Sequence, residues 1–376
     1  MKVIYILHRY HTNQIDLMKG WRENGHELLL LTQYSGGIED HADVQPVVVG
    51  YAWLFRCFDY LWMNVIRRSD PWSIIMKTKL GFPPLFKLAR HIKRFGPDVV
   101  IMRERSIYTM CATAICRLYR CPSVLYDLSP VWDKGIKTDL PHRIVHKLTP
   151  KQRITPVELR GIDYQGLIQM PGSFFAPFVT VARMSPAEKT YFKDGKINLF
   201  SVGKYQERKN HVMMLEALAD LSEKYDICLV IAGEVSDKFH AEYLARMEAY
   251  VKERGLMEKV VLLSNLDRAK MQREYQSADL HIQPASGEPA GSTITEAMSF
   301  SLPVISGSDN GTANYISPGI NGEVFMDGDT EDLKRKIETI IKDPDNIPRM
   351  GAAAYQTIVD KHSFAGYYRV LEELLV

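Results

Sequence analysis

Short apolar runs and helical spacings alternate along the first half of the chain. Residues 3–7, 27–32, 98–102 and 123–126 are dominated by apolar side chains, which predicts short buried strands. Three segments between these runs place apolar side chains at helical spacing, namely 14–24, 85–95 and 108–118. Such an alternation of strands and helices predicts a parallel sheet with helices on both faces.

The second half repeats this alternation. Its predicted strands are residues 197–202, 227–232, 260–263, 280–283, 303–305 and 323–326, and its predicted helices are 212–224, 237–254, 268–277, 293–300, 330–342 and 363–376. Residues 130–195 are irregular and rich in Pro and Gly, as expected of late strands and a linker. We therefore predict an α/β protein with two Rossmann-like, doubly wound domains, 1–190 and 191–362, and helix 363–376 packed back on the first.

Composition fits this picture and excludes other classes. The chain has 376 residues, enough for two domains, of which 46% are hydrophobic and 24% charged, as in a globular enzyme. No run approaches the roughly 18 apolar residues of a membrane span, and the first residues run from one Lys into a predicted strand, unlike a signal peptide. The five cysteines form no CxxC pair, so we predict a reduced, cytoplasmic compartment.

Charge is distributed unevenly. Residues 1–200 carry 28 Lys and Arg against 17 Asp and Glu, whereas residues 201–376 carry 19 against 28. Nine of the basic residues lie between Tyr51 and Phe95, interleaved with aromatic residues. This combination predicts peripheral contact with the anionic inner face of the cytoplasmic membrane through Trp53, Arg56, Trp62, Arg67 and Arg68. The alternative is an amphipathic helix with a solvated basic face. Nucleic acid is not predicted as a partner, because no known binding motif accompanies the charge.

Residues 283–305 are the richest candidate site. A predicted strand is followed by a loop with Glu288 and Gly291, and then by a helix that contains Glu296. A helix start preceded by Gly exposes backbone N–H groups to an anion such as a diphosphate. Carboxylates accept hydrogen bonds from vicinal hydroxyls, so Glu296 suits a ribose and Glu288 a sugar. The alternative is a capping box, Thr293 to Glu296, that only satisfies the helix terminus.

A second candidate is the segment FSVGKYQERKNH, residues 200–211. Gly203 allows a turn at the end of the predicted strand, and Lys204, Arg208 and Lys209 follow it. Two cations at this edge would neutralise the negative charge that builds on a departing diphosphate. The alternative is a solvated basic turn before a helix.

These segments resemble the C-terminal domain of the retaining glycosyltransferases of family 4, which have the GT-B fold. The matching pieces are VGKYQERKNH, LVIAGE, VVLLSNLDRAKMQREYQSADLHIQPAS and EPAGSTITEAMSFSLPVISG, with the spacing from Glu288 to Glu296 as the most specific motif. The resemblance covers residues 195–360 in detail and residues 1–130 in outline. It implies two Rossmann-like domains facing a central cleft.

The resemblance also implies roles for individual residues. Glu296 would bind the nucleotide ribose and Glu288 the hydroxyls of the donor sugar, while Asn265 and Leu266 would lie beside the base. Lys204 stands where the family usually has Arg, and Lys209 where it has Lys. Backbone N–H groups for the diphosphate would come from Gly291, Ser292 and Thr293.

The N-terminal half departs from the family pattern. Relatives often have a Gly-rich loop after the first strand, but this chain has LHRYHTNQ. Arg9, His11 or Asn13 would take the place of that loop. Asp127 follows a later strand, where it would contact hydroxyls of the donor or acceptor; alternatively it is a turn residue at a strand end.

No metal is predicted. Asp327-Gly328-Asp329 matches a metal-binding DxD, but it opens a helix, so turn and capping chemistry explain it. The resemblance implies a metal-independent retaining transferase, with no cofactor required, that moves sugar from a UDP- or GDP-sugar to a lipid-linked or glycan acceptor in surface polysaccharide or glycolipid synthesis. Two alternatives are transfer to a small soluble acceptor and a nucleotide-sugar-binding protein without turnover.

Overall fold

The computed structural model describes residues 1–36, 41, 43–62, 77–135, 139–159 and 165–375. The chain divides into two compact units. The first comprises Met1–Thr155, Leu167–Val179 and Phe364–Val376, and the second comprises Pro156–Gly166 and Thr180–Ser363. We predict a boundary between residues 190 and 191; in the structure the second unit already includes the chain from Thr180 onward.

The first unit is built on a parallel sheet. Within the described residues its strand order is β3-β2-β1-β4-β5-β7-β9, and every neighbouring pair is parallel. The strands are β1 (Lys2–Leu7), β2 (Glu27–Thr32), β3 (Val47–Val48), β4 (Val99–Arg103), β5 (Ser123–Tyr126), β7 (Arg153–Thr155) and β9 (Ser173–Phe175). A short antiparallel pair, β6 (Trp132–Asp133) with β8 (Ile168–Gln169), stands apart from this sheet.

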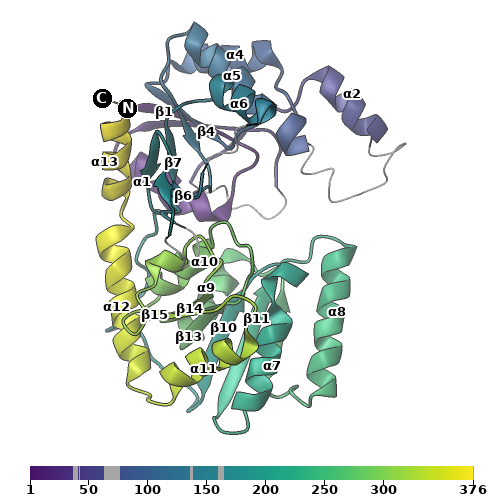
Figure 1. The fold of residues 1–376 in the computed structure, drawn as a ribbon, viewed down its shortest axis with the longest axis vertical. Helices are drawn as coiled ribbons and strands as arrows, with labels where there is room; N and C mark the ends of the chain where they lie inside the picture. The colour runs from purple at the N-terminus through teal and green to yellow at the C-terminus, as the bar shows by residue number, and fades with distance from the viewer. Residues whose placement is uncertain (37–40, 42, 63–76, 136–138, 160–164, 376) are drawn as a thin grey trace. The chain divides into compact units, whose positions relative to one another are not determined.

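Helices cover both faces of this sheet, because successive residues of each strand point to opposite sides. Tyr5 of β1 packs with α1 (Ile15–Glu23) and α13 (Phe364–Leu375), whereas Ile4 packs with α4 (Leu85–Phe95) and α5 (Ile107–Leu118). The Tyr5 hydroxyl lies 2.9 Å from the Tyr367 hydroxyl of α13, so the last helix belongs to the first unit (Figure 1). The remaining helical segments are η1 (Thr12–Gln14), α2 (Trp53–Leu61) and α6 (Leu140–Leu148).

The second unit has a parallel sheet of order β12-β11-β10-β13-β14-β15 within the described chain. This is the strand order of a dinucleotide-binding, doubly wound fold. The strands are β10 (Ile197–Val202), β11 (Ile227–Gly233), β12 (Val260–Ser264), β13 (Leu280–Gln283), β14 (Val304–Gly307) and β15 (Gly322–Phe325).

Two separate cores flank the second sheet. Leu199 of β10 packs with α7 (His211–Leu221), α8 (Lys238–Glu253) and α11 (Thr330–Ile341). The next residue, Phe200, packs with α9 (Arg268–Ser277), α10 (Ser292–Ser299) and α12 (Asn346–Lys361) on the other side. Both faces of the sheet are therefore buried, which explains why its strands are apolar throughout.

Two helices were not predicted from the sequence. Helix α6 lies in the Pro- and Gly-rich stretch, where Asp139 caps it by accepting a hydrogen bond from the His142 N–H at 3.0 Å. Helix α12 contains Pro348 in its first turn, where a proline costs no hydrogen bond, and Gly351 where it passes close to a neighbouring carbonyl. A Cβ at Gly351 would lie 2.2 Å from the Ser301 oxygen. Among the helices that the structure describes, none is long and apolar enough to cross a bilayer.

Candidate active site

The strand order indicates at which edge of the second sheet a ligand would bind. The chain order reverses between β10 and β13, which are hydrogen-bonded neighbours. In open α/β sheets, ligands bind beyond the carboxyl ends of strands at such a reversal. The loops that leave this point are the one after Val202 and the one after Gln283, and they carry the two segments singled out from the sequence.

Glu288, from the loop after β13, meets two cations from the loop after β10. Its Oε2 accepts hydrogen bonds from Arg208 Nη1 at 2.9 Å and from Lys209 Nζ at 2.5 Å. The Glu288 and Lys209 side chains are 11% and 12% exposed, so this cluster lies largely out of water. The three charged side chains therefore meet at this edge, although Glu288 lies about 80 residues from the two cations in sequence.

Burial and the neighbouring charges shift the pKa values of this cluster in opposite directions. Burial alone would raise the pKa of the Glu288 carboxyl, but Lys209 and Arg208 outweigh it and hold that pKa below its ordinary value. Burial lowers the pKa of the Lys209 ammonium, and Glu288 offsets only part of this effect. Glu288 therefore offsets part of the cost of burying the Lys209 charge.

Asn210 and Ser286 join the two loops. Asn210 adopts a left-handed conformation with φ of 51°, and its Nδ2 donates to the Pro284 carbonyl at 3.1 Å and to Ser286 Oγ at 2.7 Å. The Ser286 N–H donates in turn to the Arg208 carbonyl at 2.9 Å. These bonds hold Arg208 and Lys209 opposite Glu288, because Asn210 and Ser286 join the two loops that carry these three residues.

Gly203 lies in the turn after β10, where side chains of Lys209 and His211 come close to its backbone. A Cβ at this position would lie 3.1 Å from Lys209 Cδ, and one at Gly233 would lie 2.6 Å from the Gly203 carbonyl. The buried Tyr205 closes the same turn, with its hydroxyl 2.8 Å from the Leu263 carbonyl oxygen. The glycine predicted to permit a turn thus also lets Lys209 pass close to the backbone.

Lys204 forms an ion pair at the same edge of the sheet. Its Nζ lies 3.1 Å from Glu234 Oε2, and Arg208 takes the place beside Glu288. The reason is the pairing of β10 with β11, which puts Val202 opposite Ala232 and so brings Lys204 alongside Glu234 two residues later. In this structure Arg208 and Lys209 therefore contact Glu288, and Lys204 pairs with Glu234.

Helix α10 begins at Ser292, with Gly291 as its N-cap. The N–H groups of Ser292 and Thr293 lie in the first turn, where helix geometry provides no partner four residues back. The Gly291 N–H instead donates to Asn310 Oδ1 at 3.3 Å and to Thr312 Oγ1 at 3.1 Å. The Gly291 N–H thus has two side-chain partners in this structure.

The capping-box alternative for Glu296 is wrong. Thr293 is inside the helix rather than at its N-cap, and its hydroxyl donates to Gln283 Oε1 at 3.1 Å. Glu296 is half-buried, and its Oε2 accepts from the Tyr275 hydroxyl at 3.2 Å. The hydroxyl of Tyr275, on the neighbouring helix α9, thus contacts the Glu296 carboxylate.

Asn265 and Leu266 follow β12. Asn265 has φ of 52°, and its side chain forms two bonds with the Val235 peptide, accepting from N–H at 2.9 Å and donating to the carbonyl at 3.1 Å. Leu266 packs against the core of α9, α10 and α12. The Asn265 amide therefore shapes the loop after β11, which lies at the same edge of the sheet.

Arg9, His11 and Asn13 lie together in the loop after β1. Arg9 Nε donates to His11 Nε2 at 3.4 Å, and the His11 N–H donates to Gln14 Oε1 at 3.3 Å. All three predicted residues are half-buried. Without a glycine, this loop is held by its own side chains at the carboxyl end of the strand.

Asp127 lies between two arginines. Its Oδ1 accepts from Arg153 Nη1 at 2.6 Å, and its Oδ2 accepts from Arg105 Nη1 at 2.9 Å. Arg153 is buried and also donates to Ser173 Oγ at 2.6 Å and to the Ser129 carbonyl at 2.8 Å. The Ser129 N–H donates to Asp127 Oδ1 at 3.1 Å, as in a turn. Both carboxylate oxygens are engaged within the fold, which favours the turn interpretation over contact with a sugar.

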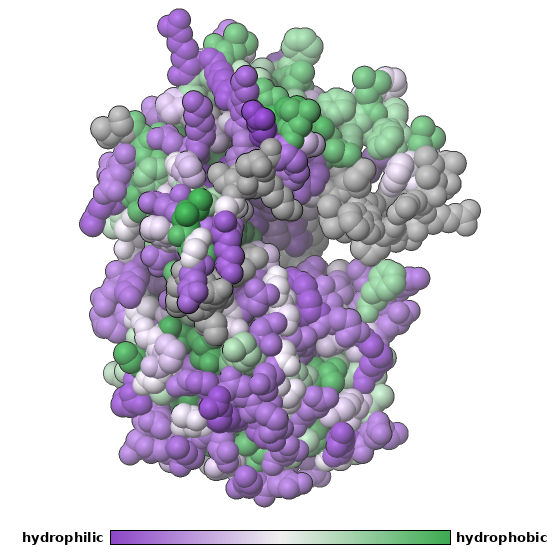
Figure 2. Space-filling model, in the orientation of Figure 1, coloured by the Kyte–Doolittle hydropathy of each residue, from purple (hydrophilic) through white to green (hydrophobic). Residues whose placement is uncertain are grey.

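Within the basic, aromatic segment, residues Trp53–Leu61 form helix α2. Trp53 and Arg56 are exposed and Trp62 is half-buried, whereas Arg67 and Arg68 lie outside the described residues. Figure 2 shows hydrophobic side chains gathered on the part of the first unit that holds α2 and α4. Within the described ranges, no group of three or more His, Cys, Asp or Glu side chains could hold a metal ion.

The chain is similar to known glycosyltransferases. Residues 186–357 match the model of the family described as glycosyl transferases group 1. The chain is 28% identical over 166 residues to the lipopolysaccharide core biosynthesis glycosyltransferase LpsE of Rhizobium meliloti, which covers 44% of this chain and 45% of that protein. It is 24% identical over 373 residues to a GDP-mannose-dependent alpha-mannosyltransferase of Corynebacterium glutamicum, covering 93% of this chain and 81% of that protein.

Residues 186–357 are therefore similar to the glycosyl transferases group 1 family. Solved structures agree on the fold. A glycosyltransferase from Rickettsia africae has a TM-score of 0.71 at 16% identity and covers 100% of this chain and 97% of its own. HepE of Anabaena, in complex with UDP-glucose, has a TM-score of 0.71 at 13% identity and covers 100% of this chain and 99% of its own. The chain therefore has the GT-B fold, as predicted.

The sequence match is concentrated in the second unit. The matches to LpsE and to the alpha-D-kanosaminyltransferase of Streptomyces kanamyceticus span about half the length of those relatives, 45% and 50%. The family model likewise starts at residue 186. The candidate cluster of Glu288, Arg208 and Lys209 lies inside the matched region, whereas the loop after β1 and Asp127 lie outside it.

Proposed function

We propose that this protein is a retaining, metal-independent glycosyltransferase that moves a sugar from a nucleoside diphosphate sugar to a lipid-linked or glycan acceptor. The observation that carries the proposal is the Glu288 carboxylate held by Arg208 and Lys209 at the strand-order reversal, in the same loop that leads to the start of α10. The match of residues 186–357 to the glycosyl transferases group 1 family supports this proposal.

Each element of this edge has a task in the proposed transfer. The first-turn N–H groups of Ser292 and Thr293, with the positive end of the α10 dipole, bind the diphosphate. Arg208 and Lys209 neutralise the charge that develops on it as the glycosidic bond breaks, which is the main electrostatic demand of the reaction. Glu288 then accepts hydrogen bonds from the donor sugar, and Glu296 accepts from the ribose.

The donor is proposed as a UDP- or GDP-sugar. The Corynebacterium relative is named as GDP-mannose-dependent, while HepE was solved with UDP-glucose, so related proteins differ in the base. Asn265, which follows β12, has its amide bonded to the Val235 peptide, so we propose that backbone groups of these loops contact the base.

Donor binding is tested by thermal shift with UDP, GDP and their common sugar conjugates, with EDTA present throughout. Binding to the folded state alone raises its stability by about 2.7 kcal/mol at a hundredfold excess over Kd, so one nucleotide series should stand out. Transfer or hydrolysis of the radiolabelled donor then distinguishes a transferase from a protein that only binds. If no nucleotide diphosphate raises the melting temperature, the proposal fails.

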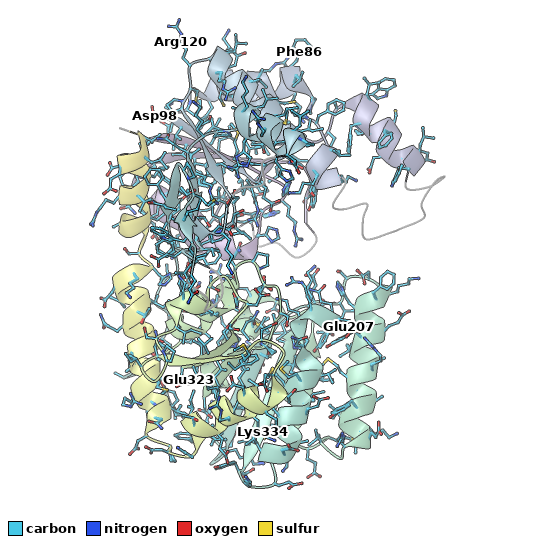
Figure 3. The ribbon with its side chains drawn as sticks, viewed as in Figure 1. Phe86, Asp98, Arg120, Glu207, Glu323 and Lys334 are labelled. Carbon is cyan, nitrogen blue, oxygen red and sulfur yellow. The ribbon has the colours of Figure 1, made fainter. Side chains whose placement is uncertain are left out.

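The acceptor is proposed to lie at an anionic membrane, to which α2 and α4 would dock. Trp53 is 71% exposed on α2. Phe86, labelled in Figure 3, is 90% exposed on α4. Exposed apolar residues around them are Leu54, Phe58, Leu61 and Leu85. The exposed cations Arg56, Arg90, Lys93 and Arg94 lie on the same two helices. Bulky apolar tips beside cations suit an anionic lipid surface.

Replacing Trp53 and Phe86 together by serine should reduce flotation with vesicles of phosphatidylglycerol by at least about tenfold, since each large side chain contributes about 1.5–3 kcal/mol on burial. The matched control is Phe239→Ser on α8, which removes a 49% exposed ring from the second unit. Equal loss in both variants, or no flotation of the unaltered protein, would refute membrane docking and favour a soluble acceptor.

A further inference from the structure

The two acids of the motif Asp327-Gly328-Asp329 act differently in the structure. Asp329 caps α11, because its Oδ1 accepts from the Asp332 N–H at 2.9 Å. Asp327 follows β15, and its Oδ1 accepts from the Ser286 hydroxyl at 2.8 Å. Capping therefore explains Asp329, whereas Asp327 contacts the loop after β13 that also carries Glu288.

We infer that Asp327 is a positioning residue for the proposed sugar transfer. It fixes the hydroxyl of Ser286 and, through this hydroxyl, the turn that carries Arg208 and Lys209. The inference rests on the proposed function, in which these two cations neutralise the departing diphosphate. It adds a residue that lies outside both segments that indicated the site from the sequence.

Asp327 determines the direction in which the Ser286 hydroxyl donates. The hydroxyl oxygen accepts from Asn210 Nδ2 at 2.7 Å, and Nδ2 also donates to the Pro284 carbonyl at 3.1 Å. A serine hydroxyl has a single hydrogen, and a carboxylate accepts hydrogen bonds without donating any. With Asp327 as its acceptor, Ser286 therefore directs its hydrogen away from Asn210 and leaves a lone pair for the Asn210 amide.

Asn210 connects this hydroxyl to the two cations. It ends the short 3-10 turn η3 (Glu207–Lys209) and adopts a left-handed conformation with φ of 51°. Such a conformation is uncommon for a residue with a side chain, although Asn adopts it more readily than most. Because Arg208 and Lys209 directly precede Asn210, the two hydrogen bonds of its amide nitrogen help to set where their side chains lie.

The Asp327 side chain is itself held at the carboxyl edge of the sheet. Its backbone N–H donates to Ser308 Oγ at 3.1 Å, and the Ser308 N–H donates to the Phe325 carbonyl at 2.9 Å. A Cβ at Gly307 would lie 3.3 Å from Asp327 Oδ1, so the carboxylate also lies close to the end of β14. The loops after β14 and β15 thus support the loop after β13.

Removing the Asp327 carboxylate should slow transfer more than it weakens nucleotide binding. In Asp327→Ala the Ser286 hydroxyl loses its acceptor and can turn its hydrogen toward Asn210, which breaks the bond that Asn210 donates. Arg208 and Lys209 act on charge that develops in the transition state, so displacing them by about 1 Å should lower kcat by about ten- to hundredfold. The Kd of the nucleotide should change by a smaller factor.

The experiment uses the full chain and measures kcat and KM for release of UDP from UDP-glucose or GDP from GDP-mannose, with water as the acceptor. Calorimetry gives the Kd of UDP and GDP. Asp327→Asn should recover most of the rate, because its amide oxygen can still accept from Ser286. Ser286→Ala removes the hydroxyl itself, and it should lower kcat as Asp327→Ala does. Both variants remain informative if Asp327→Ala fails to fold.

The matched control is Asp329→Ala, which removes the other acid of the motif and the cap of α11. It should lower the melting temperature without a comparable loss of kcat. A second test introduces Asp327→Ala into an Arg208→Gln variant. Residues that act through one hydrogen-bonded network are not additive, so the loss of kcat should be a smaller factor there than in the unaltered protein.

The outcomes separate this inference from the proposed function. If the unaltered protein binds neither nucleotide, or binds one without releasing it from a sugar, the proposed function falls and this inference falls with it. If it turns over and Asp327→Ala keeps the full kcat, only the role of Asp327 is refuted. An equal loss in Asp329→Ala, or the same factor in the Arg208→Gln variant, would also overturn the inference.

Discussion

Replacing Glu288 by glutamine is expected to lower the rate of sugar transfer by at least about a hundredfold, which is the usual effect of losing one preorganised electrostatic contact. Glutamine keeps the shape of the side chain but loses the charge that holds Arg208 and Lys209 in place. The neutral amide would also bind the donor sugar hydroxyls more weakly, since ionised acceptors make the stronger hydrogen bonds. The measurement is the initial rate of label transfer at saturating donor.

The matched control is Glu323→Gln. Glu323 is likewise buried and paired with a lysine, Lys336 Nζ at 2.7 Å, but it lies at the start of β15 rather than beyond the carboxyl end of a strand (Figure 3). Its replacement should reduce the melting temperature without a comparable loss of transfer. Near-normal transfer by Glu288→Gln, or a loss in both variants alike, would contradict the assignment.

Glu288→Gln should also change how stability depends on pH. The folded-state pKa of Glu288 lies below its ordinary value of 4.5, so its ionised form contributes stability that is fully present above that value. This contribution is lost as the pH falls through the folded-state pKa. The glutamine variant should therefore lose less stability than the unaltered protein on acidification below about pH 4.5, which urea unfolding at a series of pH values measures.

Replacing Asp127 by alanine is expected to destabilise the first unit by about 3–5 kcal/mol, the cost of leaving a buried charge unpaired. Arg153, its partner, is 4% exposed and has no other carboxylate among the hydrogen bonds of the described residues. Urea unfolding followed by the fluorescence of Trp21, buried in the same unit, reports the change, alongside the transfer rate of the folded fraction.

Glu23→Ala provides the comparison for Asp127. Glu23 forms an exposed ion pair with Lys19 on α1, and such pairs contribute only about 0.3–0.5 kcal/mol. If Asp127→Ala were as stable as Glu23→Ala and yet failed to transfer sugar, Asp127 would have a direct role with substrate. A strongly destabilised but active protein is the expected result.

Much of the fold follows from local sequence pattern. Strand β5 and helix α4 begin and end where their apolar spacing predicts, and Asp267 caps α9 as predicted, accepting from the Lys270 N–H at 2.8 Å. The pattern fails where proline and glycine interrupt it, in α6 and α12, because there burial and close packing replace the local signal. The contact of Tyr275 with Glu296 could not be predicted from the sequence either. The apolar spacing of a helix is the same whether or not a tyrosine hydroxyl on it reaches a carboxylate.

The sequence by itself determined the two parallel-sheet units, the loops that carry chemistry and the glutamates of the candidate site. Periodicity, turns and motif spacing are set by residues close together in the chain, so they can be read without coordinates. Only the tertiary structure decided which charges meet: Glu288 with Arg208 and Lys209, Lys204 with Glu234, and Asp127 with Arg153. Those pairs depend on which strands are neighbours and on how deeply each side chain is buried, and neither is encoded by spacing along the chain.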